Sequence, residues 1–313
     1  MTFINLESSK TNTPHPLGDL TTHITNDGSL SLRNSYYKES FHSLSGAKKE
    51  SKEKFLYPSQ VNRFFTSKEL RVLDVCLGLG YNSACLIEAV INSPITLNLW
   101  GLELDQRPLR TALENPIFRK SWSKSILEIL KSINNSGKWQ NDKSHGNMVW
   151  GDARQKLTFI PKDLYFDLIF LDAFSPVKCP QLWSDEFLHD LADRLAPNGR
   201  IITYSSSAAI RGSLQRAGLR IYSIIPTNKE GRGWSAGTIG IRESQAKNLT
   251  SNSTTWRTLS NMEKEHLLTS AAVPYRDPTR TSTNKEIIYR RKVEQENSQN
   301  ESTSSWKKRW DIT

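Results

Sequence analysis

A glycine-rich turn is the first segment of this 313-residue sequence that could bind a ligand. Residues 71–76 are a compact apolar run, Gly78 and Gly80 form the turn, and Asn82 stands where a following helix would begin. Glycine lets a ligand approach the backbone closely at the carboxyl edge of a sheet. A tight strand-to-helix connection would need the same glycines, so the turn alone indicates no more than a nucleotide-like ligand.

Acidic residues at the ends of the next two predicted strands narrow the kind of ligand. Glu103 ends a predicted strand at 95–104, where a carboxylate accepts hydrogen bonds from ribose hydroxyls. Asp152 follows a predicted strand at 148–150 and could accept a hydrogen bond from an adenine amine. Asp74, before the turn, would repel a pyrophosphate but tolerate a positive sulfonium. The pattern predicts S-adenosylmethionine, bound by Asp74, Gly78, Gly80, Asn82, Glu103 and Asp152.

The fourth predicted strand, residues 166–172, ends on another carboxylate. Asp172 would point into the ligand crevice at the mouth of a central strand, which makes it the catalytic candidate. Phe174 could stack on a base, and Pro176 stiffens the loop. A helix-capping role for Asp172 is the alternative interpretation.

Two further residues are candidates for substrate contact. Ser205 begins a predicted helix, and Arg232 lies on a glycine-flanked loop near the expected edge of the site. No metal-ligand spacing accompanies His42 or His145, so no metal site is predicted.

Strands that alternate with helices predict a mostly parallel sheet covered on both faces. Runs at 219–225 and 237–242 have no helix between them and predict an antiparallel pair. The fold class is therefore α/β and Rossmann-like, with a mostly parallel seven-stranded sheet that has an antiparallel edge strand. The predicted organisation is a flexible start (1–15), an extension with a β-hairpin (16–66), the main domain (67–278) and a polar, disordered tail (279–313).

The overall charge favours a polyanionic partner. The chain has 42 Lys and Arg against 32 Asp and Glu, a formal net charge of +10, and phosphates attract such an excess.

Three cysteines without CxxC spacing favour a reducing, cytoplasmic setting. No apolar run approaches the length of a membrane span.

Three strings together resemble the methyltransferase domain of the MnmC family. They are residues 74–82 (DVCLGLGYN), 150–154 (WGDAR) and 170–183 (FLDAFSPVKCPQLW). Residues 203–207 and 211–218 extend the resemblance, and Phe41-His42-Ser43 with Gly46, Ala47 and Glu50 resembles the standalone branch. The similarity covers roughly residues 20–280. Cys76 departs from the pattern, since many methyltransferases have a glycine there.

The resemblance implies a class I methyltransferase that uses S-adenosylmethionine to methylate the 5-aminomethyl group of wobble (2-thio)uridine in tRNA. It implies that Asp172 positions the amine and that the anticodon loop of tRNA is the partner. The substrate contacts would be Phe174, Pro176, Lys178, Ser205 and Arg232. No second glycine-rich strand–turn–helix is visible, so no FAD is expected.

Other functions remain open at this stage. A polyamine aminopropyltransferase-like enzyme would share the sheet and the aspartate, but it requires several acids in its pocket. The net charge of +10, with Phe174 and Trp183, favours RNA. A non-catalytic tRNA-binding protein on the same fold, or a methyltransferase for another RNA or a protein, is also compatible with the sequence.

Overall fold

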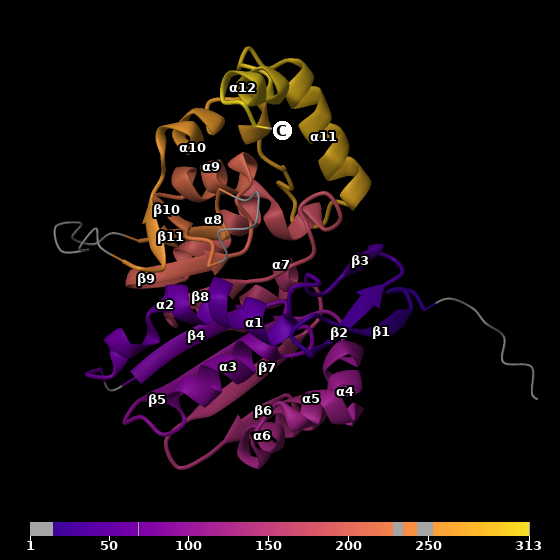
Figure 1. Cartoon of the computed structure of the whole chain (residues 1–313), viewed down its shortest axis with the longest axis vertical. Helices are drawn as coiled ribbons and strands as arrows, with labels where there is room; N and C mark the ends of the chain where they lie inside the picture. The colour runs from indigo at the N-terminus through magenta and orange to yellow at the C-terminus, as the bar shows by residue number, and fades with distance from the viewer. Residues whose placement is uncertain (1–14, 68, 228–233, 243–252, 313) are drawn as a thin grey trace, which may run out of the picture.

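The computed structural model describes residues 15–67, 69–227, 234–242 and 253–312. A nine-stranded sheet with strand order β12-β10-β11-β9-β8-β4-β5-β7-β6 forms its centre (Figure 1). Five neighbouring strands are parallel: β9 (Leu195–Thr203), β8 (Phe166–Leu171), β4 (Glu69–Val75), β5 (Thr96–Glu103) and β7 (His145–Trp150). The strand order reverses at β4, where open α/β sheets bind ligands. The predicted α/β, Rossmann-like class is confirmed.

The predicted number of strands, seven, is wrong, but the predicted antiparallel edge is confirmed, because the strand at each edge of the sheet runs antiparallel to its neighbour. β6 (Lys138–Gln140) and β12 (Trp256–Thr258) add one short strand at each edge. β10 (Arg220–Ile224) and β11 (Gly237–Ile241) form the predicted antiparallel pair, but β11 lies between β10 and β9, inside the sheet. Strands of three residues are too short to produce a readable alternation, which is why the sequence did not indicate them.

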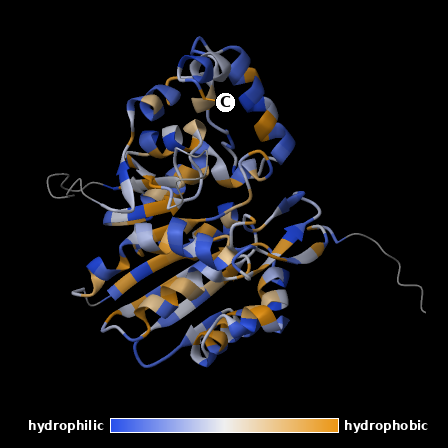
Figure 2. Ribbon diagram, viewed as in Figure 1, coloured by the Kyte–Doolittle hydropathy of each residue, from blue (hydrophilic) through white to orange (hydrophobic). Residues whose placement is uncertain are grey.

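Hydrophobic side chains alternate along the strands and form one core on each face of the sheet. On β4, Leu70 and Val72 face one core, and Leu73 and Val75 face the other. The first core is covered by α3 (Tyr81–Val90), α4 (Arg107–Glu114) and α6 (Lys124–Ser136). The second is covered by α7 (Ala153–Lys156), α8 (Asp185–Asp193) and α9 (Ala208–Arg216). Figure 2 shows this concentration of hydrophobic residues on β4, β5 and α3.

The chain between β5 and β6 forms three helices, α4, α5 (Pro116–Lys120) and α6, separated by two breaks. Asn115 caps α5, and Ser123 caps α6, each through its side chain. Pro116 explains the first break, because its ring cannot follow a helical residue without a clash.

The N-terminal extension is a small sheet followed by short helices. β1 (Leu20–Ile24) and β2 (Leu30–Asn34) form the predicted hairpin, and β3 (Glu39–Ser40) pairs with β2. Leu30 and Leu32 are fully buried in the first core, so the extension is anchored to the main domain. The chain then continues through α1 (Ala47–Ser51), the π-helical turn η1 (Lys52–Leu56), α2 (Tyr57–Ser59) and the 3₁₀ turn η2 (Val61–Phe64).

The predicted disorder of residues 279–313 is wrong. After α10 (Asn261–His266) and the 3₁₀ turn η5 (Ser270–Ala272), the chain forms α11 (Asn284–Glu296) and α12 (Thr303–Arg309), at the top of Figure 1. A capping box of Thr283 and Glu286 begins α11. Ile287 is fully buried, and Trp306, 1% exposed, stacks on the ring of His266 at 4.1 Å. Two buried anchors and a cap therefore order a segment whose composition is polar.

Residues 1–14 lie outside the described residues, so the predicted flexible start is not described by the structure. Among the described residues, no helix is long and apolar enough to cross a bilayer.

Candidate active site

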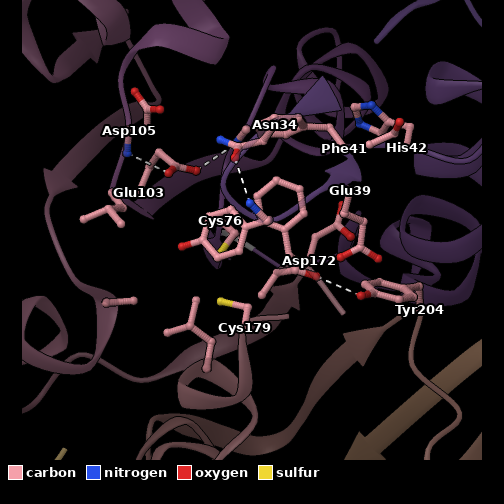
Figure 3. Close-up of a pocket in the computed structure, with 18 of the residues that line it drawn as sticks. Asn34, Glu39, Phe41, His42, Cys76, Glu103, Asp105, Asp172, Cys179 and Tyr204 are labelled. Carbon is pink, nitrogen blue, oxygen red and sulfur yellow. Dashed lines mark hydrogen bonds between the residues drawn. The ribbon is translucent and has the colours of Figure 1, made fainter. Parts of the chain in front are cut away.

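A cavity of about 490 Å³ opens at the carboxyl ends of the parallel strands (Figure 3). Gly78 follows β4, Glu103 ends β5, Asp152 follows β7, and Asp172 and Phe174 follow β8; all five line the cavity. Sites for small molecules usually have volumes of about 300–1,000 Å³. The sequence therefore identified residues from four different strands that meet in one site of suitable size.

The turn after β4 is held in a conformation that glycine favours. Gly78 has a φ of 55° and Cys76 a φ of 70°, so the residue that departs from the family pattern takes a left-handed backbone with a side chain. A Cβ atom on Gly78 would lie 3.2 Å from the ring of Phe41. Gly78 therefore brings bare backbone to the wall of the cavity, and Cys76 also lines it.

Glu103 is tied to the turn through its carboxylate. Its Oε2 atom accepts the Gly78 N–H at 2.9 Å, and its Oε1 atom accepts the Asp105 N–H at 2.9 Å. Burial raises the pKa of Glu103 to about 7, although these backbone hydrogen bonds act in the opposite direction. Each carboxylate oxygen can accept a second hydrogen bond, so Glu103 retains the capacity to bind two hydroxyl groups.

Asp152 is fixed by a network at the start of α7. It caps the helix through the Arg154 N–H at 3.0 Å and forms an ion pair with the Arg154 guanidinium at 2.6 Å. The same guanidinium binds Asp277, which is fully buried, at 2.6 Å. The segment after the sheet thus orients a carboxylate that lines the cavity.

Asp172 lies half-buried at the end of β8 and is oriented by a neighbouring amide. Asn82 Nδ2 donates to Asp172 Oδ2 at 2.8 Å, and the Asp172 N–H donates to the carbonyl of Val75 at 3.1 Å. Burial, and then the charge of Glu50, raise the pKa of Asp172 to about 7. Glu50 itself forms an ion pair with Lys54. The result is a fixed carboxyl group that titrates near neutral pH.

Three residues predicted to bind the cofactor lie behind the cavity wall. Asp74 is fully buried and accepts a hydrogen bond from Ser83 Oγ at 2.6 Å. Gly80 packs toward Leu109 and Leu130, and Asn82 acts through Asp172. Asp74 thus binds the start of α3, Gly80 allows close packing there, and Asn82 orients the catalytic candidate.

Of the described residues predicted to contact substrate, one lines the cavity and three do not. Phe174 lines the cavity, but Pro176, Lys178 and Ser205 are not among its lining residues. Ser205 is buried, and its carbonyl accepts a hydrogen bond from Thr238 Oγ1 at 2.6 Å. Arg232 lies outside the described residues.

Much of the cavity wall comes from the N-terminal extension, which sequence reasoning did not place there. Tyr37 stacks on Phe174 with ring centroids 4.4 Å apart, and Phe41 meets the edge of the same ring at 4.9 Å. Across the cavity, Tyr204 donates to the carbonyl of Ala173 at 2.9 Å. The wall also includes Asn34, Glu39, Ser40, His42, Ser43, Leu44, Glu50 and Lys54. The sequence offered one indication of this wall. The segment Phe41–Glu50 resembles the standalone branch of the MnmC family, but the resemblance did not show that the segment lines the cavity.

The lining of the cavity is acidic although the chain as a whole is basic. Its carboxylates are Glu39, Glu50, Glu103, Asp105, Asp152 and Asp172. Lys54 is its one lysine and is paired with Glu50, and burial lowers the pKa of His42 to about 4. At neutral pH the described lining therefore favours a cationic ligand.

The fold and the site define a class I S-adenosylmethionine-dependent methyltransferase. The acidic lining suits the sulfonium and ammonium groups of the cofactor, and Glu103 has the acceptors that its ribose needs. Residues 116–232 match a family described as S-adenosyl-L-methionine-dependent methyltransferase. Glu103, Asp152 and the Gly78 turn are the residues that would hold the cofactor.

Comparison with known proteins identifies the branch of that class. A crystal structure of MnmC2 from Aquifex aeolicus superposes with a TM-score of 0.75 at 25% identity, covering 91% of this chain and 88% of that one. An uncharacterized protein of Methanocaldococcus jannaschii is 30% identical over 280 residues, which are 87% of this chain and 71% of that protein.

The bifunctional MnmC of Campylobacter hominis, named for tRNA 5-methylaminomethyl-2-thiouridine biosynthesis, is 29% identical over 174 residues. The match covers 52% of this chain and only 25% of that protein. The chain belongs to the methyltransferase family that includes the MnmC methyltransferase domain and MnmC2.

Proposed function

We propose that this chain methylates the nitrogen of the 5-aminomethyl group on wobble (2-thio)uridine in tRNA, giving 5-methylaminomethyl-(2-thio)uridine. The observation that carries the proposal is the Asp172 carboxyl, held by Asn82 in an acidic cavity beside the glycine turn. Such a site suits an amine acceptor next to a cationic donor. The names of the MnmC relatives support the nucleoside and the tRNA.

S-adenosylmethionine supplies a methyl group bound to a positive sulfur when it occupies the site. Glu103 would bind the ribose hydroxyls, and Asp152 the adenine amine. Carboxylates in the lining stabilise positive charge on both the donor and the acceptor. The chain's own contribution to catalysis is then orientation of the amine and removal of its proton.

Asp172 is suited to that proton because its pKa is raised. An alkyl amine has a pKa of about 10.4. A carboxyl at the usual 3.8 would be separated from the amine by roughly 6.6 pKa units, whereas Asp172, at about 7, is separated by roughly 3.4. Proton transfer from the ammonium form is therefore less unfavourable. The hydrogen bond from Asn82 holds the ionised Asp172 carboxylate in a fixed orientation for accepting the proton.

The tRNA partner follows from features outside the acidic cavity. A chain with a net charge of +10 attracts phosphates, and the wall of Tyr37, Phe41 and Phe174 is suited to a base that has left its stack. A wobble base lies in a loop and costs little to unstack. We infer that the protein acts in the cytoplasm, because the proposed tRNA substrate would be found there.

The proposal is tested with three tRNAs that differ at the wobble position: unmodified uridine, 5-aminomethyl-uridine, and 5-aminomethyl-uridine with an acetylated amine. Only the free amine should gain one methyl group, measured by nucleoside mass analysis. Methylation of all three, or of none, would refute the proposed acceptor.

The same protein should be assayed with putrescine and decarboxylated S-adenosylmethionine. The acidic lining also suits a polyamine, so this control separates the two enzymatic readings. We expect no aminopropyl transfer.

A further inference from the structure

Four aromatic rings form a continuous series from the protein surface into the cavity. Tyr36 meets Tyr37 edge-on with centroids 5.0 Å apart, Tyr37 stacks on Phe174 at 4.4 Å, and Phe174 meets Phe41 at 4.9 Å. Tyr37, Phe174 and Phe41 line the cavity, whereas Tyr36 is 60% exposed. The outer end of the series is therefore a tyrosine ring open to solvent at the rim of the site.

The turn that carries Tyr36 is built to hold it there. Asn34, which is 2% exposed, accepts the N–H groups of Tyr36 at 2.8 Å and Tyr37 at 3.0 Å through its side-chain oxygen. Its side-chain amide donates to the carbonyl of Leu17 at 2.9 Å. A buried asparagine thus fixes the backbone at the base of the turn between β2 and β3.

Side chains of this turn point alternately inward and outward. Tyr37 and Glu39 line the cavity, and Glu39 accepts hydrogen bonds from the backbone and the hydroxyl of Ser175, both at 3.0 Å. Tyr36 and Lys38 are exposed. The inward residues join the turn to the loop after β8, so the outward residues have a fixed position relative to Asp172.

Two cations accompany the exposed ring. Lys38 is exposed and has a φ of 55°, and its carbonyl accepts a hydrogen bond from the exposed Arg33 guanidinium at 3.1 Å. An exposed aromatic ring that shares a hairpin with exposed basic side chains is a combination that binds unpaired nucleotides, because bases stack on the ring and phosphates pair with the cations.

We propose that the turn Tyr36–Lys38 receives the nucleotide next to the target base, which stacks on Tyr36 while Lys38 and Arg33 contact its phosphates. The inference rests on the proposed RNA substrate. When the target base enters the cavity, its neighbour loses a stacking partner. Tyr36, at the outer end of the aromatic series and in contact with the cavity-lining Tyr37, would supply a replacement.

The test measures binding of an anticodon stem-loop that carries 5-aminomethyl-uridine. Tyr36→Ala should weaken binding about 5- to 150-fold, the range for loss of one base–aromatic stack, and Tyr36→Phe should bind like wild type. Lys38→Ala should lower the slope of log affinity against log salt by about one. S-adenosylmethionine binding, measured by calorimetry, should be unchanged in all three variants.

Tyr165→Ala and Lys143→Ala are the matched controls. Both side chains are exposed and lie just before β8 and β7, at the opposite edge of the sheet from the cavity. Equal affinities of wild type, Tyr36→Ala and Tyr165→Ala for the RNA would overturn the inference. The proposed function would still stand if the wild type methylated the tRNA. Failure of the wild type both to bind and to methylate the RNA would overturn both.

Discussion

In the proposed reaction, Asp172 has two tasks that conflict in an ordinary carboxylate. A negative charge beside an amine orients it but also stabilises the ammonium form, which cannot attack a methyl group. Burial and the neighbouring charge of Glu50 reduce this conflict, because they raise the pKa of the Asp172 carboxyl to about 7. The group therefore ionises only near neutral pH and accepts a proton more readily than a free aspartate.

Replacing this carboxyl with an amide of the same shape tests its role. Asp172→Asn should lower kcat by about 10²- to 10⁴-fold, the usual contribution of a general base, because the amide cannot accept the proton. Cofactor affinity, measured by calorimetry, should remain close to that of wild type. Asp142→Asn, an exposed change between β6 and β7, is the control. Turnover by Asp172→Asn near that of the control would show that the carboxyl is dispensable.

The pH dependence of turnover follows from the same group. Asp172 must be ionised to accept a proton, so kcat/KM should rise as pH increases through about 7. Asn82 donates to the ionised form and favours it, so Asn82→Ala should move the inflection to higher pH and lower the maximum. The shift is measured from kcat/KM of wild type and of Asn82→Ala at pH values from about 5.5 to about 9, a range that brackets the pKa. A shift to lower pH would contradict the assigned hydrogen bond.

Among the helices and strands, those with a strong hydrophobic pattern were predicted from the sequence, and those ordered mainly by tertiary contacts were not. The parallel strands were readable because burial on both faces makes them nearly continuous apolar runs. Their end residues, such as Glu103 and Asp172, followed from topology. The Tyr36–Lys38 turn and the tail helices have mixed polar sequences, and their order comes from Asn34, Ile287 and Trp306 finding buried positions elsewhere in the chain.

The docking of the tail is tested with two tryptophans of α12 and its C-terminal end. Trp306 is 1% exposed and stacks on His266, whereas Trp310 is 36% exposed and donates from Nε1 to Glu265 at 2.8 Å. Trp306→Ala should lower the free energy of unfolding by about 3–5 kcal/mol, because it leaves a cavity. Trp310→Ala should cost about 1 kcal/mol or less. Urea denaturation measures both, and equal losses would mean that α12 is not held by Trp306.

Over the whole molecule, a basic chain surrounds an acidic cavity. The formal charge of +10 would attract the proposed RNA substrate from a distance, and the carboxylates of the lining favour positive groups at short range. This arrangement has a cost in stability when the site is empty, because burial raises the pKa of Glu103 and of Asp172 to about 7.

That cost predicts how stability depends on pH. A carboxyl whose folded pKa is raised binds protons more tightly in the folded state, so its contribution to stability falls as pH rises from about 4.5 to about 7. Glu103→Gln removes the charge but leaves one of the two backbone N–H donors without its acceptor, so its stability relative to wild type should be more favourable at pH 8 than at pH 4 by on the order of 1 kcal/mol. Thermal unfolding at the two pH values measures the difference. Greater stabilisation at pH 4 than at pH 8 would reverse the sign and refute the raised pKa.

The proposed reaction is transfer of a methyl group from S-adenosylmethionine to the amine of a wobble nucleoside. The most direct test incubates wild-type protein and Asp172→Asn with S-adenosylmethionine labelled in its methyl group and with tRNA that carries 5-aminomethyl-2-thiouridine. We predict that the label appears in 5-methylaminomethyl-2-thiouridine with wild type and is nearly absent with the variant. Label in another nucleoside, or equal label with both proteins, would contradict the account.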